Sequence, residues 1–256
     1  MSKILIQNST VFIKSYGNGT LSTPSLRGTT AQHTQVEWNG INLNSPMLGQ
    51  IDLSQIPVSQ FDEIEILYGA AGISRTGGAF GGVINMATNP VWSKGFTATL
   101  AQTIGSFNTY TTNLKIIAGS SSFQSQTKAN YSSSINNFPY YNDYLGTTVR
   151  QQNSGYQSAG ITQEIFWKIK DKHLISGRIW YNFNHRNLPP STTEYGLNHS
   201  EKEKDEALRA VIEYKLVEPH FNASVKSCLV DQFMNYRLDS TLNTTHMYYS
   251  WINRIR

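Results

Sequence analysis

The sequence predicts an α+β domain followed by antiparallel strands of a transmembrane β-barrel. Three observations support this prediction: a turn-rich first third, long runs of alternating apolar and polar residues after it, and links between those runs that are short or long in turn. The composition agrees, because only 15% of the 256 residues are charged, against about a quarter in a typical soluble protein. We place the boundary so that residues 1–89 form the first domain and residues 90–256 the second.

The first domain contains short strand-like pieces, "TVFIKSY", "QVEWNGINL" and "DEIEILYG". In the last piece Ile64 and Ile66 fall on one face and Glu63 and Glu65 on the other, which is typical of a half-buried strand. The segment "IDLSQIP" predicts a short helical turn. These short pieces are typical of a small α+β domain.

A glycine-rich segment, "GGAFGG", precedes the strand-like "VINMA". A phosphate-binding P-loop would need a lysine and a hydroxyl after its last glycine, at the start of a helix. A flexible linker would not carry the apolar Val83 and Ile84. We therefore predict a tightly packed turn, in which at least two of the glycines have positive φ or a neighbour too close for a side chain. The glycines are Gly77, Gly78, Gly81 and Gly82.

Beyond Gly95 the alternation becomes regular. In "HLISGRIWYNFNH" one face carries Ile175, Ile179, Tyr181 and Phe183, and the other carries Ser176, Arg178, Asn182 and Asn184. The run "EALRAVIEYKLV" repeats the pattern. We count about eight such runs, each near the length that a tilted strand needs to cross a bilayer.

The links between the runs differ in length. "GSSS", "KDKH" and "VEPH" are short, whereas "INNFPYYNDYLGTTVRQQNSGY" and "NLPPSTTEYGLNHSEKEKD" are long. Short turns on one side and long loops on the other are typical of outer-membrane barrels. The alternative is a soluble β-sandwich, whose strands also alternate, but it would leave an aromatic and aliphatic band in water.

Several classes of protein are disfavoured. The net charge of +4 is spread along the chain without a run of Lys and Arg, which argues against nucleic-acid binding. Cys228 is the single cysteine, so an internal disulfide is excluded. No apolar run reaches the length of a transmembrane helix. The start "MSKILIQNS" lacks the features of a signal peptide, and we expect the natural N-terminus to be missing.

Four ordered motifs resemble the plug domain of TonB-dependent outer-membrane receptors. They are "SLRGTTAQHTQVEWNGINLNSP", "DLSQIP", "DEIEILYG" and "GAFGGVINMAT", and they are most similar to the vitamin B12 (cobalamin) transporters. The resemblance implies a plug inside a 22-stranded barrel in the bacterial outer membrane, surrounded by lipid and driven by a TonB-type energy-coupling protein. Eight strands would enclose only their own side chains. We therefore expect this chain to be a fragment with an incomplete barrel.

The resemblance also implies where a small nutrient would bind. Binding residues concentrate on loops held by a rigid scaffold, and the plug apices would be residues 17–22 and 44–50. The alternative is ordinary turn chemistry, because the same residue types favour turns. The candidate ligand-binding residues are Gly19, Leu21, Ser22, Asn44, Ser45, Met47, Leu48 and Gln50.

Two arginines are candidates for plug–barrel contact. The resemblance implies that Arg27 pairs with acidic residues of the barrel, and the alternative is a solvated arginine. The family has a second arginine where this chain has Tyr68. Arg75 is the candidate substitute for it.

Other polar residues favour no cofactor and no catalysis. His33 is interpreted as a polar turn residue rather than a metal ligand. The tyrosines of "PYYNDY" either stack on a ligand or belong to the aromatic girdle of the barrel. Asp143 alone is too few ligands for the Ca²⁺ that the family sometimes holds in outer loops. Glu63 and Glu65 lack a cleft, and no nucleophile elbow is present, so an enzyme is not expected.

The functional expectation is TonB-coupled import of a scarce nutrient, with a cobalamin-like ligand favoured. A receptor for a siderophore, haem or another nutrient would use the same plug. A non-transporting surface adhesin and an outer-membrane enzyme are the alternatives from other classes.

Overall fold

The computed structural model describes residues 1–17, 19–46, 48–69, 79–92, 94–197, 200–238 and 242–255. The chain divides into two compact units, Met1–Asn89 and Pro90–Arg256, each of which is described here by itself. Among the described residues, no helix is long and apolar enough to cross a membrane.

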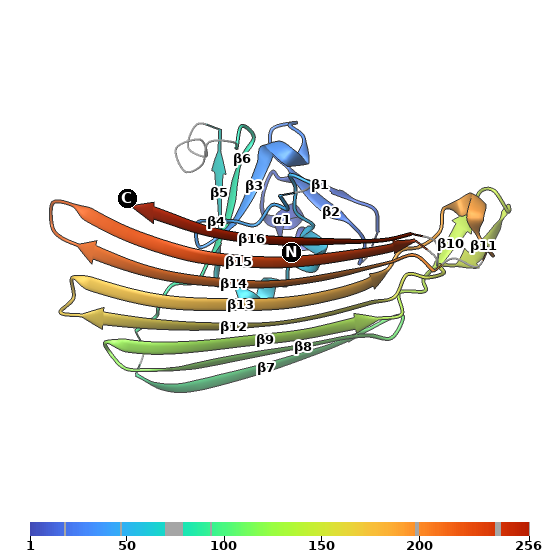
Figure 1. The fold of residues 1–256 in the computed structure, drawn as a ribbon. Helices are drawn as coiled ribbons and strands as arrows, with labels where there is room; N and C mark the ends of the chain where they lie inside the picture. The colour runs from blue at the N-terminus through green and yellow to red at the C-terminus, as the bar shows by residue number, and fades with distance from the viewer. Residues whose placement is uncertain are drawn as a thin grey trace. The chain divides into compact units, whose positions relative to one another are not determined.

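The first unit is built around a small mixed sheet (Figure 1). Its strand order is β4 (Ile41–Asn42), β3 (Thr34–Trp38), β6 (Gly82–Ala87) and β5 (Glu63–Tyr68), with β3 and β6 parallel. Every residue of β3 is buried, and Val36, Trp38 and Ile84 are fully enclosed. This apolar centre lets the unit hold its sheet despite the shortness of the strands.

Shorter elements surround this sheet. The hairpin of β1 (Phe12–Ser15) and β2 (Ser22–Ser25) forms a second, two-stranded sheet. The 3₁₀ turns are η1 (Ala31–His33), η2 (Leu53–Gln55) and η3 (Val58–Gln60), and η2 confirms the helical turn predicted in "IDLSQIP". The N-terminal helix α1 (Ser2–Asn8), which buries Leu5, was not predicted.

The packed glycine turn is confirmed at two positions. Gly82 has φ +143, and a Cβ added there would collide with the carbonyl oxygen of Leu67 and lie 2.8 Å from Leu26 Cδ1. A Cβ at Gly81 would collide with Thr29 Oγ1 and lie 3.1 Å from the carbonyl oxygen of His33. Gly77 and Gly78 lie outside the described residues. Glycine is therefore required where this segment enters β6.

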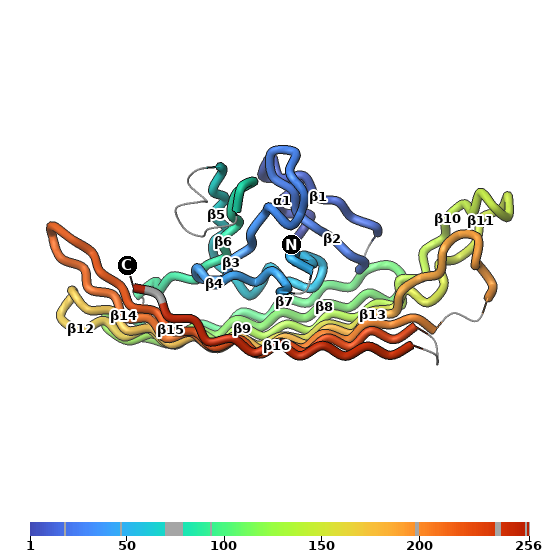
Figure 2. Tube along the Cα trace, turned by 45° about the horizontal axis from the view of Figure 1, so that its top comes forward, coloured from blue at the N-terminus to red at the C-terminus, as the bar shows by residue number. Residues whose placement is uncertain are grey.

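The second unit contains an eight-stranded antiparallel sheet among its described residues. Each strand pairs with its neighbours in chain order, so β7 and β16 form two open edges. Figures 1 and 2 show the long strands lying side by side in one bowed layer. The strands are β7 (Gly95–Gly105), β8 (Thr109–Gly119), β9 (Phe123–Ser134), β12 (Tyr156–Ile169), β13 (His173–Asn187), β14 (Lys202–Val217), β15 (Asn222–Leu238) and β16 (Leu242–Ile255). The predicted fold class, with an incomplete barrel sheet, is confirmed.

The links at the two ends of this sheet differ as predicted, with one exception among the described residues. The turns at residues 120–122, 170–172 and 218–221 lie at one end, and the long links 135–155 and 188–201 lie at the other, where the link 106–108 is also short. The first long link folds into a hairpin of β10 (Pro139–Asn142) and β11 (Thr147–Arg150). The second contains η4 (Thr192–Glu194) and meets that hairpin through Asn142 Nδ2, which donates to the carbonyl oxygen of Thr192 at 2.9 Å.

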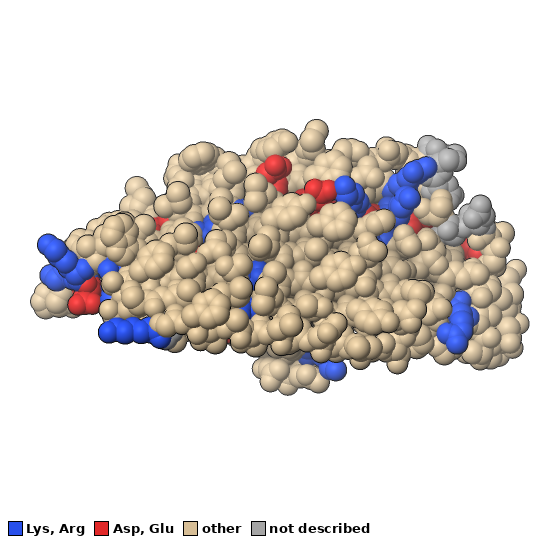
Figure 3. All heavy atoms as spheres, turned by 90° about the horizontal axis from the view of Figure 1, so that it is seen from below, with Lys and Arg blue, Asp and Glu red and all other residues tan. Residues whose placement is uncertain are grey.

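The predicted alternation is confirmed on β13. Ile179 is 52% exposed, whereas its neighbour Arg178 is 4% exposed. Directly opposite residues of neighbouring strands share a face, so Gln163 of β12 and Ala210 of β14 lie on the same face as Ile179. We call the Ile179 side the outward face. Figure 3 shows one side of the molecule on which Lys, Arg, Asp and Glu gather mostly towards the margins.

Polar side chains on the outward face satisfy one another. Gln163 accepts a hydrogen bond from Thr127 Oγ1 at 2.5 Å and donates from Nε2 to Ser125 Oγ at 2.9 Å. Since lipid offers no hydrogen-bond partner, this pairing makes the outward face compatible with a hydrocarbon environment.

The first prediction concerns the outward face. Substitution of Ile179→Arg should lower the free energy of unfolding of the complete protein by about 2–4 kcal/mol, because a cation would face the middle of the bilayer. The measurement is reversible denaturant unfolding in lipid vesicles, with Ile179→Leu as the apolar control. Equal stability of the arginine and leucine variants would contradict the assigned face.

The second prediction concerns the glycine turn. Gly82→Ala should destabilise the first unit by more than the roughly 1 kcal/mol expected from positive φ alone, because its Cβ also meets backbone. Gly28→Ala is the matched control, since Gly28 has φ +71 but no atom within 4 Å of an added Cβ. The test is denaturant unfolding of both variants, and equal losses would show that crowding at Gly82 is unimportant.

Candidate ligand-binding site

The first predicted apex is the turn that joins β1 to β2. Tyr16 N donates to the carbonyl oxygen of Leu21 at 3.2 Å, and Thr20 Oγ1 donates to the carbonyl oxygen of Gly17 at 2.8 Å. Gly19 has φ +73, which makes it a turn residue. Ser22 is buried and Leu21 half-buried. Much of this segment therefore serves to shape the turn.

The second predicted apex is a loop closed by the Asn44 side chain. Asn44 Oδ1 accepts from Val36 N, and Nδ2 donates to the carbonyl oxygens of Thr34 and Gly49, each at 3.0 Å. Ser45 N also donates to the carbonyl oxygen of Gln50 at 3.0 Å. Asn44 is thus a loop-closing residue as well as a ligand candidate.

Leu48 is an exposed apolar residue of the closed loop. Its side chain is 49% exposed, while its carbonyl oxygen accepts from Gln32 Nε2 at 3.2 Å. Gln50 is half-buried at the end of the loop, and Met47 lies outside the described residues. The loop therefore offers an apolar side chain on a fixed backbone, which suits contact with the apolar part of a ligand.

Asp52 ties the two apices together. Its Oδ1 accepts hydrogen bonds from Ser22 N and Ser54 N, both at 2.9 Å. The end of the first turn is thereby fixed to the segment directly after the second loop. We did not predict this role, although an Asp directly before a helical turn is a recognisable N-cap.

Arg27 lies beside Tyr68 within the first unit. Its guanidinium carbon is 5.8 Å from the centre of the Tyr68 ring, and Arg27 itself is exposed with φ +53. Tyr68 therefore gives Arg27 a cation–π contact. Pairing of Arg27 with barrel acids stays a prediction, and Arg75 lies outside the described residues.

His33 and the candidate tyrosines have ordinary surroundings. His33 Nδ1 is 3.2 Å from Thr30 Oγ1, and its ring meets Phe80 edge-on. Tyr141 and Tyr144 are exposed on the β10–β11 hairpin. Among the described residues, no group of three or more His, Cys, Asp and Glu side chains could hold a metal ion.

A row of opposite charges crosses the buried side of the long sheet. Arg178 lies between two carboxylates, with Nη1 3.1 Å from Glu213 and Nε 3.8 Å from Glu164. Lys128 is 3.5 Å from Glu164, and Lys226 is 3.4 Å from Glu213. We call these five residues the wall charge row. Because it joins β9, β12, β13, β14 and β15, each carboxylate is shared by cations of two neighbouring strands.

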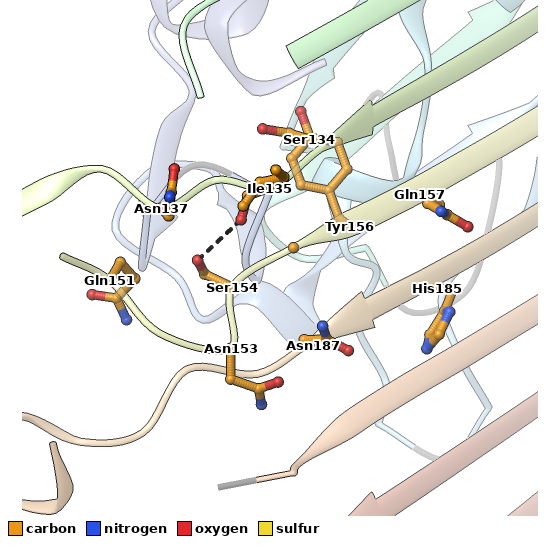
Figure 4. Close-up of a pocket in the computed structure, with 11 residues that line it drawn as sticks. Ser134, Ile135, Asn137, Gln151, Asn153, Ser154, Tyr156, Gln157, His185 and Asn187 are labelled. Atoms are coloured by element: carbon orange, nitrogen blue, oxygen red, sulfur yellow. Dashed lines mark hydrogen bonds between the residues drawn. The ribbon is translucent and has the colours of Figure 1, made fainter. Parts of the chain in front are cut away.

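The loop end of the same sheet contains a polar pocket of about 450 Å³ (Figure 4). It lies where β9 and β13 end and β12 begins, and we call it the rim pocket. Its lining residues are Ser134, Ile135, Asn137, Gln151, Asn153, Ser154, Gly155, Tyr156, Gln157, His185 and Asn187. Sequence reasoning missed this pocket because its residues come from three distant segments.

The comparisons with known proteins agree with the fold. Residues 1–83 match the family model described as TonB-dependent Receptor Plug Domain. The vitamin B12 transporter BtuB of Photobacterium profundum is 34% identical over 88 residues, which cover 34% of this chain and 14% of that protein. The vitamin B12 transporter BtuB of Vibrio vulnificus is 36% identical over 74 residues, or 29% of this chain and 12% of that protein.

Solved receptors share the fold over most of the chain. The siderophore receptor PirA from Acinetobacter baumannii superimposes with a TM-score of 0.74 at 13% identity, covering 96% of this chain and 40% of that one. A mutant of the ferric enterobactin receptor PfeA from Pseudomonas aeruginosa gives 0.66 at 13% identity, covering 98% and 42%. The chain thus spans less than half the length of these proteins. They are receptors and transporters rather than enzymes.

The third prediction concerns the wall charge row. Arg178→Met should lower the free energy of unfolding by more than the roughly 1 kcal/mol of an exposed pair, because two buried carboxylates lose their shared cation and keep only Lys128 and Lys226. Lys172→Met is the control: Lys172 pairs with Glu218 at 2.9 Å in an exposed turn, where a pair contributes at most about 1 kcal/mol. Denaturant unfolding of the complete protein measures both. A loss at Arg178 no larger than at Lys172 would refute a structural role for the row.

Proposed function

We propose, from the premise that this chain is a TonB-dependent receptor plug followed by the first strands of its barrel, that the complete protein imports a scarce nutrient across the bacterial outer membrane. The proposal rests on the order in which two parts, the first domain and the long sheet, occur along the chain. A domain matching the plug family precedes a sheet whose outward face is apolar. A sheet of this kind suits the lipid-facing wall of a barrel.

A cobalamin-like ligand is the favoured cargo. The support comes from two vitamin B12 transporters, which are 34% and 36% identical to this chain over 88 and 74 residues. The siderophore receptors align over more of the chain but at 13% identity, which supports the fold without favouring their ligands. A ferric siderophore or another nutrient is therefore the second candidate.

In this proposal the plug apices help to capture the ligand at the outer side. Asn44 and Asp52 fix the backbone of the two apices, so little loop entropy is lost when a ligand binds. Leu48 supplies apolar contact. A TonB-type energy-coupling protein then displaces the plug, and the close-packed turn at Gly81 and Gly82 belongs to the scaffold that moves rather than to the binding surface.

The experiment is equilibrium binding of cobalamin and of a ferric siderophore to the complete protein. We expect cobalamin to bind more tightly. Tighter binding of the siderophore would favour a siderophore as the imported nutrient. Binding of neither ligand would refute capture of these nutrients and favour a surface adhesin.

The fourth prediction separates the apex from the scaffold. Leu48→Asp should weaken ligand binding about tenfold or more, as expected for removal of a buried apolar contact at an interface. Leu145→Asp is the matched control, because Leu145 is similarly exposed on the turn of the β10–β11 hairpin. Both variants should fold normally. If Leu48→Asp binds ligand as well as Leu145→Asp does, the apex is placed wrongly.

A further inference from the structure

The rim pocket has a rigid scaffold of its own. Ser154 Oγ donates to the carbonyl oxygen of Asn136 at 2.8 Å, and Asn136 Nδ2 donates back to the carbonyl oxygen of Ser154 at 3.2 Å. Asn153 Nδ2 bridges the next link by donating to the carbonyl oxygens of Leu188 and Glu201 at 2.7 and 2.9 Å. These bonds join both long links to the strand ends, so the pocket is preorganised.

A second set of polar side chains in the pocket is not used by the scaffold. In the part of the chain that the structure describes, these side chains make no hydrogen bond to protein. They belong to Asn137, Gln151, Gln157, His185 and Asn187. Each amide offers two donor hydrogens and an acceptor oxygen. The pocket therefore combines occupied amides that hold its shape with amides that are free for a ligand.

The free side chains, four amides and one imidazole, come from several directions. Gln157 and His185 are direct cross-strand partners on β12 and β13, and Asn187 follows at the end of β13. Asn137 and Gln151 come from the link between β9 and β12. Figure 4 labels these side chains, and it shows the Tyr156 ring beside Ser134, its cross-strand partner, apart from Gln157 and His185. A ligand there would meet hydrogen-bonding groups from two strands and from the link between them, and Ile135 is an exposed apolar residue of the lining.

The chemistry of the lining restricts the ligand. None of the eleven lining residues is Asp, Glu, Lys or Arg, so nothing in the lining pairs with a strongly charged ligand or binds a metal through carboxylates. A sugar hydroxyl both donates and accepts, which matches an amide. The volume lies in the usual range for small-molecule sites.

We propose that the rim pocket binds an uncharged pyranose unit. This inference does not depend on the proposed import of cobalamin. The sugar could be carried by a soluble oligosaccharide or by a glycolipid of the surrounding membrane. His185 and Asn187 flank the buried Arg186 on β13, and Gln157 is opposite His185, so all three belong to the outward face at the rim of the sheet.

The fifth prediction tests this binding with the complete protein in a detergent that has no sugar head group. Soluble probes are neutral trisaccharides of gluco, galacto and manno configuration, measured by isothermal titration calorimetry. The lipid probe is a phosphatidylcholine vesicle with or without a neutral glucosyl lipid. We expect at least one probe to bind, and Gln151→Leu and Asn187→Leu each to weaken it about tenfold. Gln102→Leu, the same change on the outward side of β7, should leave binding unchanged.

The outcomes are distinct. Binding of a trisaccharide alone assigns a soluble sugar, and binding of the glucosyl vesicle alone assigns a membrane glycolipid. Heat-modifiable migration of each variant on gels checks that the barrel has folded, and the two single variants provide independent tests if one of them fails to fold. Binding by no probe, or equal binding by the Gln151, Asn187 and Gln102 variants, would overturn the proposal.

Discussion

The two-residue period of the long strands, held in one register across eight of them, is the constraint on which the second unit depends. A slip of one residue would exchange the faces of a strand. On β13 it would turn Arg178 towards the outward face and Ile179 towards the buried one. A slip would therefore be unfavourable for two reasons. Arg178 would lose its carboxylate partners, and Ile179 would leave its apolar surroundings.

The same register assembles the wall charge row. Glu164 is directly opposite Arg178, and Glu213 is directly opposite Lys226. Neither pair could form if one strand moved by a residue. Within the row, Glu164 and Glu213 each form ion pairs with cations from two strands. Glu164 and Glu213 are thus already paired with cations of the same sheet.

Much of the fold could be predicted from the sequence because its signals are local. The alternation of β13 and the length of each link can be recognised in a short stretch of sequence. The adjacent glycines at 81 and 82 indicate a crowded backbone in the same way. Helix α1 was missed because seven residues with one buried leucine carry little periodicity. The β10–β11 hairpin was missed because it lies inside a polar link that resembles a loop.

The candidate site was harder to predict, because roles depend on partners far along the chain. In the sequence, Asn44 is compatible with a turn residue or with a ligand contact. Only its hydrogen bonds to Val36 and Thr34 identify it as the residue that closes the loop. Asp52 acts through Ser22, thirty positions away. The rim pocket joins Ser134 to Asn187. An amide in the sequence carries no sign of whether its hydrogen bonds will be used by the scaffold.

The most direct test of the two-faced strand is a nitroxide scan of residues 174–184 in lipid vesicles. The complete protein would carry Cys228→Ser, which removes the single native cysteine, and one labelled cysteine at a time. We predict that collision with lipid-dissolved oxygen alternates with a period of two, high at 175, 179, 181 and 183 and low at 176, 178, 180 and 182. The opposite phase, or no alternation, would contradict the account.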